Sequence, residues 1–246
     1  MEVHAHTHTP RKKWTHYFWE FLMLFLAVFC GFLAEYQLEH TIEKHRGKEI
    51  VVSLIEDLKT DTALLGSQLN ILKNNKAIYD SLVILLTSSG IKEKGADLYY
   101  YGRWPFRFSF IKYTDRTIQQ LKNAGSYRLI KNTVVSDSIL KYYSNLERLY
   151  SLQDQIHERQ EEYIVSSREL FDPVVFESMV DDGTNSITKP SGNPPLLDYE
   201  RKPLLKLVSI IHNLKSGNRS IQREILNRYN EGQALIQFLK SEYHLK

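Results

Sequence analysis

The stretch Trp14–Ala34 reads WTHYFWEFLMLFLAVFCGFLA, and it decides how the rest of the chain is interpreted. It is apolar and rich in aromatic residues, and no charge follows Glu20 until Glu35. A helix needs roughly 20 apolar residues to cross the core of a bilayer. Aromatic residues crowd the N-terminal end of the stretch, as they do in the interfacial belts of membrane proteins. The stretch therefore predicts one membrane-spanning helix that holds everything after it at a bilayer surface.

A cleaved signal peptide is the alternative interpretation, since it has the same basic start with a shorter apolar run. Its cleavage site would need a small-x-small pattern, but the bulky Phe32 stands two residues before Ala34. We therefore favour a retained anchor. The basic triplet Arg11–Lys13 precedes the stretch and favours a cytoplasmic N-terminus. In a bacterium this orientation places the anchor in the inner membrane and the larger C-terminal part in the periplasm.

One face of the predicted membrane helix carries a pattern of small residues. Glu20, Ala27 and Ala34 repeat every seven residues, and Gly31 lies on the same stripe. The pair Ala27 and Gly31 has small-xxx-small spacing, which lets two helices approach closely. Chance spacing with Glu20 near the headgroups is the simpler interpretation. The alternative is packing of this stripe in a homodimer or against a membrane protein partner.

The composition limits the class of protein to which the part after the anchor can belong. The chain has 246 residues, of which 42% are hydrophobic and 25% charged, which is typical of a globular protein. Its 32 basic and 29 acidic residues leave a net charge of +3, so no nucleic-acid partner is expected. The single cysteine, Cys30, lies inside the apolar stretch, which excludes a disulfide framework and a thiolate metal site.

Hydropathy divides the chain into a cytoplasmic tail at 1–13, the membrane helix at 14–34, a charged helical stalk at 35–48 and a helical domain at 49–246. Within this domain, apolar residues recur at helical spacing. A long loop rich in Gly, Pro and Ser is expected at 181–203. The predicted helices cover 50–72, continued by 78–86 to a stop near Ser88–Gly90, then 116–124, 136–171, 203–215 and 220–244.

Capping residues mark several helix boundaries. Thr114 and Asp115 precede the helix at 116–124, and Gly125 follows it. A polar run with a central glycine, residues 216–218, divides the last two helices. The predicted fold class is therefore all-α, with one N-terminal transmembrane helix followed by an antiparallel helical bundle.

Residues 91–113 interrupt the helical pattern. Trp104, Phe106, Phe108 and Phe110 alternate with polar residues or proline, which is the period of a strand or of an extended segment lying over a bundle. Arginines among aromatic residues also occur where nucleic-acid bases stack, but the balanced charge argues against that use. We expect one aromatic extended segment that seals the core as a flap.

Catalytic signatures are missing from the sequence, which has no phosphate-binding loop, dinucleotide glycine fingerprint or nucleophile elbow. The best metal candidates are Asp154, His157 and Glu161, which share one face of the helix at 136–171. A metal site inside a bundle needs a second such motif on another helix, and the sequence has none. A solvated helix face is therefore favoured, and neither a metal nor another cofactor is expected.

Three further features have simple interpretations. His4, His6 and His8 form a tract that can bind Zn or Ni weakly, but a flexible tail is the better interpretation. Asp181 opens a stretch that resembles part of a calcium loop with the wrong spacing, so a turn is expected. His212 stands beside apolar residues and is interpreted as a histidine at the edge of the core.

Two stretches resemble a family of uncharacterised bacterial membrane proteins found in Bacteroidetes-type genomes. The first is WTHYFWEFLMLFLAVFCGFLAEYQLEH, followed by Ser53–Leu58. The second runs from Thr117 through Leu121, Gly125 and Leu129–Ile130 to Tyr142–Tyr143. The resemblance spans about residues 10–165 and rests on pattern rather than on active-site residues. It implies a single-pass anchor with a helical extramembrane domain, and it brings no catalytic or binding residues.

The sequence supports three hypotheses about function. The first is a non-enzymatic, membrane-anchored helical domain that binds a protein partner or scaffolds a complex at the cell envelope. The second is an extracytoplasmic sensor that signals through a partner, since a helical domain joined to a membrane helix suits signal transmission. The third is a metal-dependent enzyme that uses Asp154, His157 and Glu161. Non-enzymatic binding is favoured because catalytic motifs are missing.

Overall fold

The computed structural model of the chain describes residues 13–107, 110–123, 125–181 and 183–245. These residues form two compact units, one ending at Ile50 and one starting at Val51. The histidine tract of the predicted tail lies outside the described residues, and so does Phe108. The regular structure of the described residues is helical, which confirms the all-α fold class.

In the first unit, the described residues form the first part of helix α1 (Trp14–Leu86). Their large apolar side chains are exposed, and Phe21 and Leu24 are 67% and 71% exposed. By length and composition this segment is able to cross a membrane. The predicted stalk and the two helical stretches after it belong to the same helix, which ends at Leu86 beside the predicted stop.

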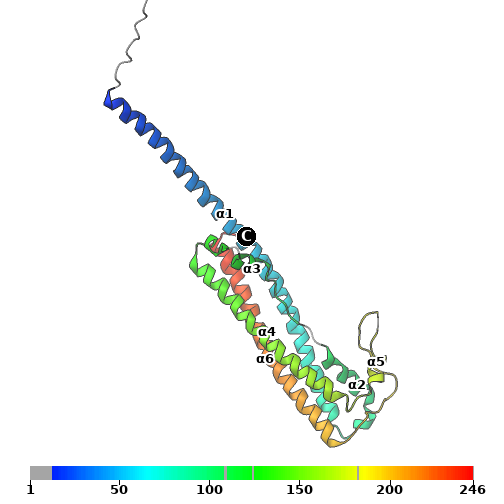
Figure 1. Ribbon diagram of the computed structural model, residues 1–246. Coiled ribbons are helices and arrows are strands. Elements are labelled where there is room, and N and C mark those ends of the chain that lie inside the picture. Colours follow the sequence, from blue (N-terminus) through cyan, green and yellow to red (C-terminus); the bar gives the residue numbers. More distant parts are fainter. Residues whose placement is uncertain (1–12, 108–109, 124, 182, 246) are drawn as a thin grey trace, which may run out of the picture. The chain divides into compact units, whose positions relative to one another are not determined.

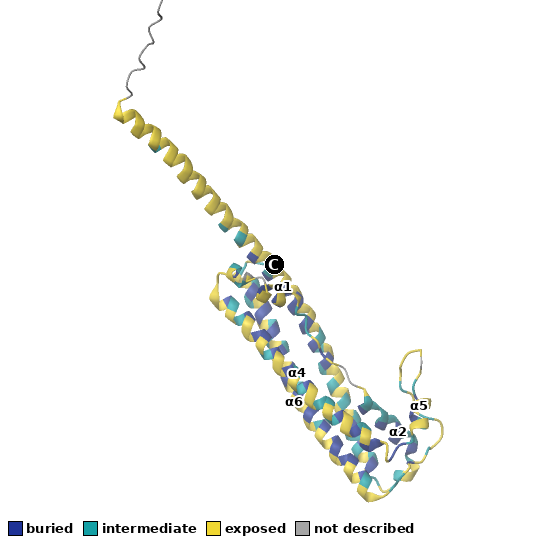
Figure 2. Cartoon of the chain, in the orientation of Figure 1, coloured by how far each residue is buried: buried dark blue, intermediate teal, exposed yellow. Residues whose placement is uncertain are grey.

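The second unit is built on three long helices, which are α1 from Val51 onward, α4 (Thr133–Ser167) and α6 (Arg201–Glu242) (Figure 1). Buried residues line the sides on which these helices face one another, and exposed residues lie outside (Figure 2). This amphipathic division matches the helical spacing of apolar residues in the sequence. The most deeply buried side chains of the long helices include Leu54, Leu58, Leu82, Ile139, Tyr163, Leu207, Ile211, Ile225 and Leu239.

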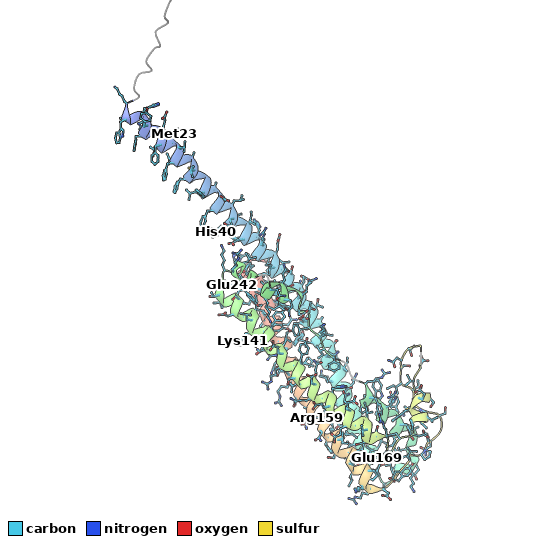
Figure 3. All side chains as sticks on the ribbon, in the orientation of Figure 1. Met23, His40, Lys141, Arg159, Glu169 and Glu242 are labelled. Carbon is cyan, nitrogen blue, oxygen red and sulfur yellow. The ribbon has the colours of Figure 1, made fainter. Side chains whose placement is uncertain are left out.

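Helix α6 runs antiparallel to α4. At one end of the pair, Asn132 Nδ2 donates to Glu242 Oε2 over 2.9 Å. At the other end, Lys206 near the start of α6 pairs over 2.7 Å with Glu169, which follows α4; Figure 3 labels Glu169 and Glu242 at the two ends. Asn132 also caps α4, because its side chain accepts hydrogen bonds from the first backbone amides of that helix.

Helix α6 is antiparallel to α1 as well. Asn218 of α6 donates to the carbonyl oxygen of Leu72 over 2.9 Å, and Lys215, earlier on α6, pairs with Asp80, later on α1. Residue numbers therefore rise along α1 as they fall along α6. It follows that α1 and α4 run parallel to each other, and the chain must return along the bundle between them.

The returning chain contains short helices that the sequence pattern did not predict. The aromatic alternation predicted at 104–110 does not begin as a strand, because Trp104–Phe106 make a 3-10 turn, and the backbone is extended at Arg107. The alternation reflects ring packing instead, since Phe106 contacts the rings of Tyr163 and Phe176. The new elements are η1 (Ile91–Glu93), α2 (Gly95–Arg103) and η2 (Trp104–Phe106).

Helix α3 (Arg116–Asn123) matches the predicted helix at 116–124 closely. Gly125 follows it in the left-handed conformation, with φ of 59°, which a glycine adopts without steric cost. A short turn, η3 (Ser126–Leu129), leads on towards α4.

Two buried aspartates of α1 hold the start of α3. Asp57 accepts hydrogen bonds from the backbone amide of Thr117 over 3.1 Å and from its hydroxyl, and it pairs with Arg116 over 2.7 Å. Asp61 Oδ1 accepts from the backbone amide of Thr114 over 2.7 Å. Burial raises the pKa of Asp61 from 3.8 to about 6. The side chains that cap this helix thus come partly from another helix.

The predicted division of the last helix at 216–218 is wrong, since α6 is continuous. Gly217 lies where α6 meets α4, and an added Cβ would stand 3.0 Å from Ile156 Cγ1 and 2.9 Å from Arg159 Nη1. Asn218 makes the bond to Leu72 described above. Glycine often marks a helix end, but here Gly217 lies within a continuous helix and allows α6 to pack closely against α4.

Residues between α4 and α6 are also more ordered than the sequence suggested. Helix α5 (Pro173–Ser178) begins with Pro173, and Asp172 caps it by accepting from the Val174 amide over 2.8 Å. Helix α4 ends at Ser167, four residues before its predicted end at 171. Among the described residues, an isolated bridge joins Val180, just before the predicted loop, to Ile187 within it.

Candidate functional site

A cavity of about 670 Å³ lies inside the second unit, between the three long helices. Bundle interiors are normally packed to the density of organic crystals, so a space of this size is unusual. Two other segments complete its wall, the aromatic segment around η2 and the loop that carries the bridge between Val180 and Ile187. The lining residues of the long helices are Gln68, Ile71, Leu72, Asn75, Tyr79, Ile156, Gln160, Leu214, Asn218, Ile221 and Ile225.

The cavity is elongated along the bundle. On α1 its lining runs from Gln68 to Tyr79 with helical spacing, which is about 16 Å at the rise of an α-helix. On α6 it runs from Leu214 to Ile225, over an equal length in the opposite direction. The two helices thus present one continuous stripe each, and α4 contributes only Ile156 and Gln160 to the wall.

Two buried glutamines of α4 fasten the aromatic segment over the bundle. Gln153 donates to the carbonyl oxygen of Ile111 over 3.1 Å and accepts from its amide over 2.6 Å. Gln160 Nε2 donates to the carbonyl oxygens of Pro105 and Arg107 over 3.0 and 3.1 Å. The expected flap therefore exists, and Trp104, with others of its residues, lines the cavity.

Gln153 and Gln160 were not predicted as functional residues, but the sequence carries a signal for them. They lie seven residues apart on the apolar face of α4, at positions that are 1% and 4% exposed. A glutamine at such a position must satisfy its amide, and an unpaired backbone segment is a suitable partner.

Positive charge is concentrated at one part of the cavity wall. The guanidinium of Arg103 stacks on the rings of Phe106 and Phe176, 4.8 and 5.6 Å from their centroids. Arg107 lies 5.3 Å from the ring centroid of Trp104 and donates to the backbone oxygen of Asn185. Burial lowers the pKa of Arg103, and the neighbouring charge of Arg107 acts in the same direction.

The predicted metal candidates do not converge. His157 Nε2 lies 4.0 Å from Glu161 Oε1, its ring contacts the ring of Phe110, and Asp154 is exposed. Within the described parts of the chain, no group of three or more His, Cys, Asp or Glu side chains is placed to hold a metal ion. The structure thus gives Asp154, His157 and Glu161 no shared site.

Other residues singled out from the sequence have local roles. Asp181 accepts from the amide and hydroxyl of Thr184, both over 2.7 Å, so the expected turn is confirmed. The interpretation of His212 as a core-edge residue is wrong, because its side chain points from the exposed face of α6. In the first unit, Glu20 pairs with His16 over 3.0 Å, and an added Cβ on Gly31 would meet nothing within 4 Å.

A comparison with protein-family models, with curated proteins and with solved structures finds no match to this chain.

Proposed function

We propose that this protein is a membrane-anchored, non-enzymatic receptor whose helical unit binds a small molecule in the central cavity. The observation that carries the proposal is the cavity itself. Its volume of about 670 Å³ falls within the roughly 300–1,000 Å³ typical of small-molecule sites. A few polar side chains stand among apolar ones, as such sites require for orientation and specificity.

The apolar part of α1 supports the anchoring half of the proposal. We propose that it crosses the bacterial inner membrane once, with the helical unit in the periplasm. The first hypothesis drawn from the sequence was protein interaction, and it forms the second part of this proposal. A partner protein at the cell envelope binds the helical unit differently when the cavity is filled and when it is empty. The metal-dependent alternative has no comparable support, because its three residues share no site.

Small molecules retained by the purified full-length protein test this function. The protein would be extracted from its membrane in mild detergent, washed and denatured, and the released compounds identified by mass spectrometry. Ile71→Tyr places a larger side chain at the cavity wall, at a position that is already 42% exposed. Ile84→Tyr is the matched control, since Ile84 lies on the same helix, is 66% exposed and does not line the cavity.

We expect a compound that the wild type and Ile84→Tyr retain and that Ile71→Tyr loses. Adding that compound back should raise the melting temperature of the wild type and the control only, because binding to the folded state stabilises it. A compound profile that is the same in all three proteins, with no thermal shift, would refute the receptor function.

A further inference from the structure

The charged residues that line the cavity are both arginines. Arg103 and Arg107 contribute to its wall, and no Asp or Glu does so among the described residues. The remaining polar lining is made of neutral amides and a tyrosine, such as Gln68, Asn75 and Tyr79. The cavity therefore presents positive charge without an acidic counterpart in its own wall.

Neither arginine is neutralised by an ion pair in the part of the chain that the structure describes. Arg103 rests on aromatic rings, and Arg107 rests on Trp104 and donates to a backbone oxygen. Glu177, an exposed residue of α5, favours the charged form of Arg103 but makes no ion pair with it among the described residues. Two like charges on the wall of one cavity favour an anion between them.

Unused polar atoms stand beside these charges. The indole Nε1 of Trp104, the Nε of Arg103 and the Oε1 of Gln160 are buried and have no hydrogen-bond partner. Buried polar groups in folded proteins are nearly always paired, so such a cluster at a cavity wall requires an explanation. Two of the three atoms are donors, but all three are covered by protein atoms, so the arginine charges are what the cavity wall offers to an anion.

The opposite part of the cavity is lined mainly by apolar residues, with Gln68 of α1 as its polar member. Gln153 lies about two helical turns before Gln160 on α4, and it holds Ile111 by hydrogen bonds. Ile111 lines the cavity at that level. Ile221 and Ile225 line the same part from α6, and both are buried. The wall thus changes from cationic to apolar along the roughly 16 Å of the bundle that the cavity occupies.

We propose that the cavity takes an elongated amphiphilic anion. Arg103 and Arg107 hold its carboxylate or phosphate head, and its apolar body lies between α1 and α6 towards Ile225. This inference rests on the proposed receptor function and specifies its ligand class. Such an anion has two sources, a free organic acid from solution or an anionic lipid from the membrane.

Trp104 offers a direct readout of this site. The chain has three tryptophans, Trp14, Trp19 and Trp104, so Trp14→Phe with Trp19→Phe leaves Trp104 as the sole emitter. The full-length double variant would be reconstituted in phosphatidylcholine nanodiscs. Octanoate and octanamide would then be titrated separately, because they share one chain length and differ in charge. A parallel sample in nanodiscs that contain phosphatidylglycerol tests the lipid source.

We expect octanoate to change the emission of Trp104 at concentrations about tenfold lower than octanamide, since an arginine pair discriminates for charge. Arg107→Gln should weaken octanoate binding about tenfold and leave octanamide binding unchanged. Arg107 is exposed, so this variant is expected to fold, and Arg107→Lys should restore part of the affinity. Arg201→Gln is the control, because it removes an exposed arginine outside the cavity.

An emission change caused by phosphatidylglycerol alone, and lost in Arg107→Gln, would support the same ligand class with the membrane as its source. Equal binding of octanoate and octanamide would overturn the anionic class and leave the receptor function standing. No response to octanoate, octanamide or phosphatidylglycerol would also overturn the anionic ligand class. The retained-compound experiment tests the receptor function separately. A neutral compound that the wild type retains and Ile71→Tyr loses would support the receptor function and contradict the anionic ligand class.

Discussion

Replacing Asp61 with asparagine should stabilise the protein at neutral pH and remove part of its pH dependence. Asp61 is 2% exposed on α1, and its Oδ1 accepts from the Thr114 amide. Its second carboxylate oxygen is buried without a hydrogen-bond partner. The neighbouring acids Asp57 and Asp115 add repulsion to the cost of burial, and together these effects raise the pKa of Asp61 to about 6.

The sign of the effect follows from proton linkage. The folded state binds the proton of Asp61 more tightly than the unfolded chain does, so stability is greatest below pH 3.8 and falls as pH rises towards about 6. The difference between these pKa values corresponds to at most about 3 kcal/mol. Solvent screening reduces it, and asparagine keeps only a weaker, neutral bond to the Thr114 amide. We therefore expect Asp61→Asn to gain about 1–2 kcal/mol at pH 7 and little at pH 4.

Urea denaturation of the full-length protein in detergent, followed by circular dichroism between pH 4 and pH 8, measures this difference. Asp57→Asn is the matched control, one helical turn earlier on α1. It weakens the bonds from Asp57 to Arg116 and Thr117 and should lower stability at pH 7. A loss of stability in Asp61→Asn that is equal at every pH would refute the reasoning, because it would mean that a charged Asp61 stabilises the fold.

Three further substitutions test the packing. Gln153→Leu should cost about 2–3 kcal/mol, because it leaves the buried amide and carbonyl of Ile111 without partners; urea denaturation measures the loss. Gly102→Ala should cost about 1–3 kcal/mol, since the new Cβ would lie 2.6 Å from Cζ of the buried Phe171. Gly66→Ala should instead stabilise the protein by about 0.5–1 kcal/mol, because it meets only ordinary van der Waals contact in mid-helix. Thermal melts of these two glycine variants should shift in opposite directions, and equal shifts would contradict the close contact of Gly102 with Phe171.

Local signals were sufficient for much of the fold. Gly125 ends α3 as predicted, because the left-handed glycine acts within a few residues in sequence. Asn132 caps α4 through an equally local contact, but the helix was predicted to start at 136, three residues after its first residue, Thr133. The prediction failed where a local signal and a tertiary contact disagreed. Gly217 suggested a helix end, but the close approach of α4 requires a small residue inside a continuous helix.

The candidate site was partly visible in the sequence. The aromatic segment was expected to lie over the bundle, and its arginines were noticed, but only for base stacking. The cavity beneath it depends on the separation of α1, α4 and α6, which no residue pattern reports. Gln160 shows the difficulty, since its position on α4 is readable while its partners, Pro105 and Arg107, lie far away in sequence.

The sequence by itself determined that this chain carries one apolar helix long enough to cross a membrane, followed by an all-α domain. Both conclusions come from the spacing of apolar residues along one chain, which is a local property. Only the tertiary structure decided that the aromatic segment lines a cavity with Arg103 and Arg107 in its wall. That arrangement arises from contacts between residues that are distant in sequence, and the free energy of such contacts depends on how whole helices pack.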